Sequence, residues 1–115
     1  MNDRDVRRLL FICSRNQWRS PTAENVFRRH PSVEVRSAGT SAKARRTVSV
    51  SDLQWADEII VMESKHKQTL RAKFDRSLLR RDIHVLNIPD EYQFMDPELV
   101  QLLLDVVEPI LERRD

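Results

Sequence analysis

A short segment near the start of the chain combines the signals of a buried strand, a polar loop and a helix start. The apolar run of residues 9–12 ends at Cys13, and such a run is typical of a fully buried strand. Ser20 followed by Pro21 is typical of a helix start, because serine caps a helix and proline suits its first position. The segment therefore predicts a strand, a short loop and a helix in succession.

Strand and helix signals alternate along the rest of the chain. The expected strands are residues 9–12, 33–36, 58–62 and 83–88, and the expected helices are residues 21–29, 52–55, 62–74 and 99–111. This alternation predicts a parallel sheet with helices on both faces. Within it, residues 33–36 should form an edge strand, Ser51 should cap the short helix, and Pro109 should kink the last helix or end it early.

Length and composition indicate one compact domain spanning residues 1–115. Charged residues make up 33% of the chain and apolar residues 40%, which is typical of a globular protein. No apolar stretch approaches the roughly 20 residues that span a bilayer, so we expect no membrane association. The single cysteine excludes an intrachain disulfide and suits a reducing compartment, which predicts a cytoplasmic protein.

The predicted loop places a thiol at one end and a guanidinium at the other, Cys13 and Arg19. A loop of this kind at a helix N-terminus directs backbone N–H groups inward, so it should bind a phosphate- or sulfate-type anion. The same surroundings favour the thiolate form of a cysteine. A thiolate beneath a phosphate ester can form a cysteinyl-phosphate that water later hydrolyses. The alternative is a buried structural cysteine.

Residues 10–27 resemble the phosphate-binding loop of low-molecular-weight protein tyrosine phosphatases. That family follows an apolar strand with C-x-G-N-x-C-R-S-P and then A-E-x-x-F. Positions of this chain that match the pattern are Cys13, Asn16, Arg19, Ser20, Pro21, Ala23, Glu24 and Phe27. Residues 37–40, 55–62 and 87–92 resemble later family segments, the last of which bears the general acid. The resemblance implies a three-layer α/β/α fold whose four parallel strands have the flavodoxin-like order 2-1-3-4.

The chain departs from the family pattern at three places. Arg15 replaces the loop glycine, Trp18 replaces the second cysteine, and Glu91 follows Asp90 where the family has proline. We expect a steric cost at Arg15, because glycine serves where φ is positive or the backbone comes close. The lone cysteine also argues against the related arsenate reductases, which need further thiols.

The resemblance and the chemistry together assign roles to the site residues. Cys13 is the expected nucleophile, Arg19 the phosphate clamp and Asp90 the general acid, because Asp90 follows the fourth strand. Asp96 is the alternative acid, although its position before the last helix favours an N-cap. The residues expected to bind phosphate or substrate are Ser14, Arg15, Asn16, Gln17, Trp18 and Ser20, and those expected to support them are Ser37 and Tyr92.

No metal or other cofactor is expected. The histidines, His30, His66 and His84, lack the spacing of metal ligands, so we expect them to be surface or packing residues.

These observations predict a cysteine-dependent phosphomonoester hydrolase, most simply a protein tyrosine phosphatase. Its substrate is expected to be a phosphorylated protein or a small aryl phosphate, and Gln17 and Trp18 leave phosphotyrosine, phosphoarginine and small esters open. The alternative is a non-catalytic phosphate-binding or regulatory domain, which Arg15 and Glu91 favour. Basic residues concentrate in the first half of the chain, but without an aromatic-interleaved basic tract we do not expect a nucleic-acid partner.

Overall fold

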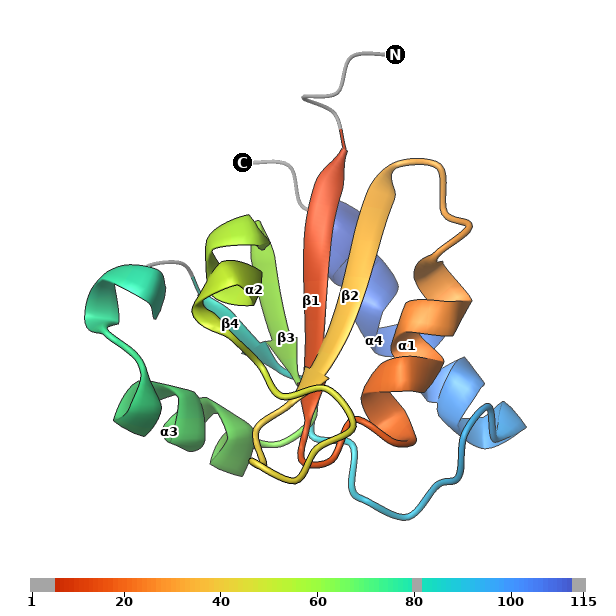
Figure 1. Cartoon of the computed structure of the whole chain (residues 1–115). Coiled ribbons are helices and arrows are strands. Elements are labelled where there is room, and N and C mark those ends of the chain that lie inside the picture. The colour runs from red at the N-terminus through yellow and green to blue at the C-terminus, as the bar shows by residue number, and fades with distance from the viewer. Residues whose placement is uncertain (1–5, 80–81, 113–115) are drawn as a thin grey trace.

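A computed structural model of the chain describes residues 6–79 and 82–112. Strands and helices alternate along these residues (Figure 1). The strands are β1 (Arg7–Cys13), β2 (Val33–Gly39), β3 (Glu58–Val61) and β4 (Ile83–Val85). The helices are α1 (Arg19–Phe27), α2 (Val50–Trp55), α3 (Ser64–Lys73), the 3₁₀ helix η2 (Arg76–Leu79) and α4 (Pro97–Glu112).

The strands form one parallel sheet with the order β2-β1-β3-β4. Helices α1 and α4 cover one face of the sheet, and α2 and α3 cover the other (Figure 1). The predicted three-layer fold, the order 2-1-3-4 and the edge position of β2 are therefore confirmed. The loops that follow the strands gather at the carboxyl edge of the sheet, where parallel α/β proteins bind ligands.

Side chains of β1 alternate between two hydrophobic cores, one on each face of the sheet. Leu9, Phe11 and Cys13 belong to the core beneath α1 and α4. Leu10 and Ile12 belong to the core beneath α2 and α3. All five side chains are buried, as expected for a central strand of a parallel sheet. This alternation fixes the face of the sheet on which the Cys13 thiol lies.

Helix α1 begins earlier than the sequence predicts, and Ser20 does not cap it. Trp18 is the residue at the N-cap, and it makes no side-chain capping hydrogen bond. Ser20 lies inside the helix, and its buried hydroxyl contacts the thiol of Cys13 instead. The prediction of Ser20 as the cap was therefore wrong, because the tertiary contact with Cys13 determines where its hydroxyl points.

Two other helix boundaries also differ from the predictions. Ser49 rather than Ser51 caps α2, since its hydroxyl accepts the backbone N–H of Asp52 and the Asp52 carboxylate accepts the backbone N–H of Ser49. Helix α4 continues through Pro109 to Glu112, so the early end is not observed. Asp96 does lie at the start of α4, where its carboxylate accepts the backbone N–H of Glu98.

Strand β4 is shorter than expected, but the chain beyond it stays beside β3. The backbone N–H of Leu86 donates to Val61, and that of Ile88 donates to Met62. These bonds extend the line of β4 as far as Ile88 and bring Asp90 to the carboxyl edge of the sheet. Across residues 6–79 and 82–112, no helix has the length and apolar character needed to cross a membrane.

Candidate active site

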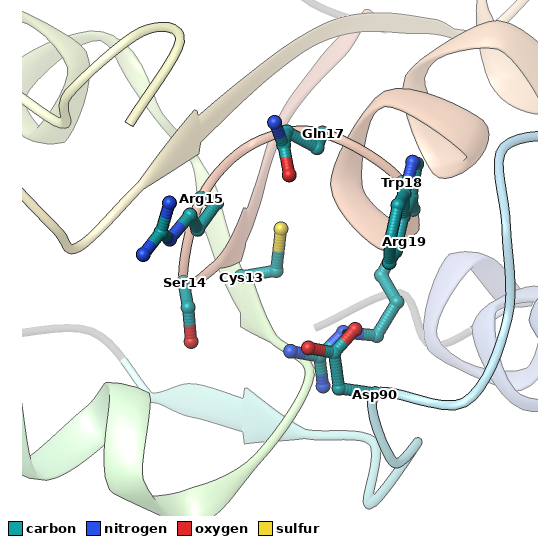
Figure 2. Close-up of a pocket in the computed structure, with 7 residues that line it drawn as sticks. All are labelled: Cys13, Ser14, Arg15, Gln17, Trp18, Arg19 and Asp90. Carbon is teal, nitrogen blue, oxygen red and sulfur yellow. Dashed lines mark ion pairs between the residues drawn. The ribbon is translucent and has the colours of Figure 1, made fainter. Parts of the chain in front are cut away.

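A cavity of about 150 Å³ opens at the carboxyl end of β1. Its walls are formed by Cys13, Ser14, Arg15, Gln17, Trp18, Arg19 and Asp90. Figure 2 shows the thiol of Cys13 inside the arc of the loop that leads to α1. The cavity is much smaller than the roughly 300–1,000 Å³ of sites for drug-sized ligands. Its size and position suit a small group held over the sulfur.

The segment after β2 holds the carbonyl groups of this loop from outside. Cys13 accepts a hydrogen bond from the backbone N–H of Thr40, and Ser14 accepts one from Ser41. Arg45 donates twice, from its backbone to Arg15 and from Nε to the Asn16 carbonyl. In a trans peptide the N–H group points opposite to the carbonyl. The N–H groups that follow these carbonyls therefore point into the arc.

Those N–H groups are available to an anion. Among the hydrogen bonds of residues 6–79 and 82–112, none is donated by the backbone N–H groups of residues 14–19. The same residues lead into the N-terminus of α1, where the helix dipole adds positive potential. The loop thus has the donors and the field that bind a phosphate-type anion.

The thiol of Cys13 is part of a buried polar network. Its Sγ lies 3.0 Å from Oγ of Ser20. The Ser20 hydroxyl accepts a hydrogen bond from Nδ2 of Asn16 at 2.9 Å. Because Asn16 already donates to Ser20, the hydroxyl proton of Ser20 is free to point at the sulfur or at the Ala38 carbonyl, 3.3 Å away. The network therefore places a hydrogen-bond donor beside the sulfur.

Asn16 also connects the loop to β2 and α1. Its Nδ2 donates to Oγ of Ser37 at 2.9 Å, and Ser37 donates to the Glu24 carboxylate at 2.6 Å. The structure thus brings together Asn16, Ser20 and Ser37, all of which the sequence analysis names as site residues. Glu24, to which the sequence analysis gave no role, completes the chain of bonds. Oδ1 of Asn16 is buried without a hydrogen-bond partner among the described residues.

The positive φ of the loop lies at Asn16, not at Arg15. Asn16 has φ of 56°, a conformation that asparagine tolerates better than most residues. Arg15 is not among the residues with positive φ, so the expected strain at this position was wrong in that respect. Its side chain is exposed and points away from the Cys13 sulfur (Figure 2).

Arg19 extends beside the cavity and is only 2% exposed. Its Nη1 donates to the Glu63 carboxylate at 2.6 Å and to the Ile88 carbonyl at 2.8 Å. Partial burial opposes the ionised form of Glu63, but the hydrogen bond and charge of Arg19 outweigh it and keep the pKa of Glu63 below its ordinary value. Nη1 is thus anchored, while no described residue accepts a hydrogen bond from Nη2.

The two candidate acids occupy different places. Asp90 lines the cavity, and its Oδ1 lies 3.6 Å from Nε of Arg19. Asp96 does not line the cavity, and its carboxylate is engaged at the N-terminus of α4. Tyr92 is also outside the cavity wall, and its hydroxyl faces Glu98 at 3.5 Å. The geometry therefore favours Asp90 over Asp96 as the group that meets a ligand.

Gln17 and Trp18 line the cavity together with Cys13 and form its exposed rim. Both side chains are exposed, Trp18 by 42%. The Trp18 carbonyl accepts hydrogen bonds from the backbone and hydroxyl of Thr22, and the same hydroxyl accepts the backbone N–H of Met95. The segment after Asp90 is thereby tied to the rim.

His66 is a residue of the site that sequence reasoning missed. It lies in the first turn of α3, is only 1% exposed, and its Nε2 lies 2.9 Å from Oγ of Ser14. Burial and the charge of Arg19 lower its pKa to about 4. No ligand spacing could reveal it, because the contact joins residues far apart in sequence. Among the described residues no cluster of His, Cys, Asp and Glu is suited to hold a metal ion.

Comparison with known proteins agrees with this geometry. The sequence model of the family described as low molecular weight phosphotyrosine protein phosphatase matches residues 8–51. No curated protein sequence matches the chain significantly.

Solved structures extend the similarity over most of the chain. Wzb, a tyrosine phosphatase of Escherichia coli K30 solved with phosphate, superimposes with a TM-score of 0.72 at 22% identity, covering 91% of this chain and 96% of that chain. Wzb of Vibrio vulnificus, solved with benzylphosphonate, gives a TM-score of 0.74 at 19% identity, covering 92% and 97%. The arginine phosphatase YwlE of Geobacillus stearothermophilus gives 0.64 at 23% identity, covering 92% and 88%. The chain therefore has the fold of the low molecular weight phosphotyrosine protein phosphatases and carries their sequence pattern over residues 8–51, which confirms the resemblance predicted from its sequence.

Proposed function

We propose that the protein is a cysteine-dependent phosphomonoester hydrolase, most simply a protein tyrosine phosphatase. The observation that carries the proposal is the position of the Cys13 thiol. It lies on the floor of a cavity, inside an arc of backbone N–H groups that donate no hydrogen bond to any described residue. The family match over residues 8–51 and the fold of known phosphatases support it.

In the first step, the Cys13 thiolate attacks phosphorus and the ester P–O bond breaks. The loop N–H groups and Arg19 stabilise the charge that develops on the phosphoryl oxygens. With Nη1 anchored on Glu63, Nε and Nη2 of Arg19 form the fork that grips two of these oxygens. Asp90 donates its proton to the leaving oxygen. The products are a cysteinyl-phosphate and the dephosphorylated alcohol.

In the second step, water hydrolyses the cysteinyl-phosphate. The Asp90 carboxylate, now ionised, removes a proton from the water as it attacks phosphorus, and the bond between sulfur and phosphorus breaks. Ser20, 3.0 Å from the sulfur, donates a hydrogen bond to the departing thiolate. Inorganic phosphate leaves and Asp90 is again protonated for the next cycle.

We assign an aromatic phosphate ester as the favoured substrate, carried by a phosphorylated protein or a small molecule. Trp18 is exposed at the rim of the cavity, where its ring can stack on an aromatic leaving group. The structural relatives include both tyrosine and arginine phosphatases. Rates with phosphotyrosine and phosphoarginine substrates would therefore distinguish the two, and equal or higher rates with phosphoarginine would overturn the assignment.

The rival function is a non-catalytic phosphate-binding domain. It is favoured by the exposed Arg15 and by Glu91 after Asp90, both departures from the family pattern. An assay with an aryl phosphate across pH, with Cys13→Ser beside the parent protein, tests the two. The hydrolase should turn over and the variant should bind phosphate without turnover. Phosphate binding by the parent with no hydrolysis of any aryl phosphate would favour the rival.

We further propose a reducing, cytoplasmic setting, because the proposed mechanism needs Cys13 as a free thiol. Peroxide should inactivate the enzyme, and inorganic phosphate in the cavity should slow this loss. Equal inactivation with and without phosphate would contradict the placement of the anion over Cys13.

We also propose that residues 1–115 form one folding unit, supported by the single sheet that joins both hydrophobic cores. Urea unfolding should give one transition by tryptophan fluorescence and circular dichroism. Two separate transitions would contradict it.

A further inference from the structure

Arg45, in the segment after β2, holds the loop between β1 and α1 by its side chain. Its backbone N–H donates to the Arg15 carbonyl at 3.0 Å, and its Nε donates to the Asn16 carbonyl at 3.0 Å. Among the described residues, every other donor to a carbonyl of residues 13–17 is a backbone N–H group. The contact from Nε is therefore the one that a substitution can remove.

The two carbonyls that Arg45 holds lie on either side of the Asn16 Cα. The Arg15 carbonyl shares a peptide group with the N–H of Asn16, and the Asn16 carbonyl shares one with the N–H of Gln17. Because peptide groups are planar, holding both planes fixes the backbone angles of Asn16. Asn16 has φ of 56°, a left-handed conformation that persists only where the surroundings hold it. Arg45 supplies such a hold from outside the loop.

The same contacts direct two N–H groups of the loop. In a trans peptide the N–H points opposite to the carbonyl, so outward carbonyls at Arg15 and Asn16 turn the N–H groups of Asn16 and Gln17 into the arc. Neither N–H donates to a described residue. Successive N–H groups around a left-handed residue form a concavity that binds anions. Without the contact from Nε, the peptide between Asn16 and Gln17 is free to rotate and withdraw one donor.

The segment that carries Arg45 is itself firmly attached to the sheet, beside the loop (Figure 1). The backbone N–H of Gly39 donates to the Arg46 carbonyl at 2.8 Å, and that of Val48 donates to the Gly39 carbonyl at 2.9 Å. The Arg46 guanidinium donates to the Ser37 carbonyl at 2.8 Å and pairs with the buried Asp52 of α2. The side chain of Arg45 therefore acts on the loop from a fixed base.

We propose that Arg45 is a positioning residue of the active site: its Nε holds the Asn16 carbonyl outward, so that the Gln17 N–H stays directed at an oxygen of the bound phosphate group. Arg45 does not line the cavity, so it acts through the loop and not on the ligand itself. This inference rests on the proposed function, but it concerns phosphate binding before any bond is broken.

Removal of the side-chain donor should weaken phosphate binding. Arg45→Met lacks the donor but keeps the backbone bond to Arg15, and its affinity for inorganic phosphate should fall roughly tenfold, the effect of one hydrogen bond from a charged donor. KM for an aryl phosphate should rise by a similar factor, because only molecules with the ordered loop bind. Since the bound phosphoryl group restores that order, kcat should change little.

A conservative variant separates the hydrogen bond from the charge. In Arg45→Gln, the amide nitrogen is as many bonds from Cα as Nε of arginine, so it can donate to the Asn16 carbonyl without a positive charge. Arg45→Gln should therefore retain most of the phosphate affinity that Arg45→Met loses. The matched control is Lys43→Met, which removes a charge from the same segment. Lys43 is exposed and its ammonium has no described partner, so this variant should bind phosphate like the parent.

Phosphate titration by calorimetry, KM and kcat for an aryl phosphate, and urea unfolding test the proposal. Equal losses of affinity in Arg45→Gln and Arg45→Met would assign the effect to charge and overturn it. An Arg45→Met protein that is less stable but binds phosphate normally would also overturn it, as would a matching loss in Lys43→Met. A parent that binds phosphate with the expected pattern but never turns over would contradict the proposed hydrolase and leave the role of Arg45 supported. A parent that does not bind phosphate would overturn both.

Discussion

The thiol of Cys13 lies 3.0 Å from the hydroxyl of Ser20, which Asn16 holds from the other side through a 2.9 Å hydrogen bond. Since Asn16 donates to Ser20, Ser20 retains its own proton, which can point at the sulfur or at the Ala38 carbonyl. A hydrogen bond from this hydroxyl stabilises the negative charge that returns to the sulfur when the bond between sulfur and phosphorus breaks.

Replacement of Ser20 by alanine should therefore slow the hydrolysis of the cysteinyl-phosphate most. We expect kcat for an aryl phosphate to fall about tenfold or more, the effect of one hydrogen bond to a charged sulfur. A burst of the released alcohol in rapid-mixing kinetics should become more pronounced, because the second step is slowed. An unchanged kcat would show that Ser20 only supports the loop. Ser51→Ala, exposed on α2, is the matched control.

Asp90 and Asp96 should respond differently to replacement by asparagine. Asp90→Asn should lower kcat strongly for esters of poor leaving groups, and less for p-nitrophenyl phosphate, whose leaving oxygen needs little protonation. Asp96→Asn should preserve kcat, since the carboxylate of Asp96 binds the backbone at the start of α4. Asparagine caps helices about as well as aspartate, so stability should also change little. The reverse pattern of kcat would make Asp96 the acid.

Replacement of Gly39 by alanine should damage the site, although Gly39 itself does not line the cavity. A Cβ at this position would lie 2.5 Å from the Ser14 carbonyl oxygen and 2.6 Å from Cβ of Ala44. The backbone contact between β2 and the loop must then open, and we expect weaker phosphate binding and a loss of stability of about 1–3 kcal/mol. Urea unfolding and phosphate titration measure both effects.

A second substitution separates the two clashes at Gly39. Gly39→Ala combined with Ala44→Gly removes only the contact with Cβ of Ala44, so it should restore the protein in part. Full recovery of phosphate binding would contradict the role assigned to the Ser14 carbonyl.

The stability of the fold should fall as pH falls, in part because of His66. Its pKa is lowered from 6.5 to about 4 in the folded protein, so the unfolded chain binds a proton more readily between these values. Stability from this group is complete above pH 6.5 and is lost progressively down to about pH 4, at up to about 1.4 kcal/mol per pH unit.

Urea unfolding of the parent and of His66→Gln at several pH values checks this slope. The parent should lose more stability than the variant between pH 6.5 and pH 5. In this range carboxylates such as Asp52 contribute less than His66 to the pH dependence of stability, because their pKa values lie lower. Parallel pH dependence of the two proteins would contradict the buried, neutral state of His66.

The fold and the centre of the site are largely predictable because their signals are local. The apolar run before Cys13 identifies β1, the spacing from Cys13 to Arg19 identifies the loop, and Ser20 followed by Pro21 predicts the helix after it. Strand and helix alternation predicts the parallel sheet, and the sheet brings Asp90 to the same edge as Cys13. Asp96 is recognisable as a cap from the residues directly after it.

The remaining features depend on contacts between distant segments. Ser20 has the sequence signature of a cap, but the buried thiol competes for its hydroxyl. The positive φ of the loop lies at Asn16, whose side chain is fixed by Ser37 from another strand. His66 enters the site only because α3 packs beside the loop after β1. None of these contacts leaves a periodicity or spacing in the chain.

The most direct test of the central claim is to trap the phosphorylated enzyme. Asp90→Ala mixed with p-nitrophenyl phosphate should form the intermediate readily but hydrolyse it slowly, because the second step lacks its base. After an acid quench, peptide mass spectrometry should find one phosphoryl group on Cys13, and none in the Asp90→Ala protein that also carries Cys13→Ser. Rapid release of p-nitrophenol without phosphate on Cys13, or with phosphate on another residue, would contradict the account.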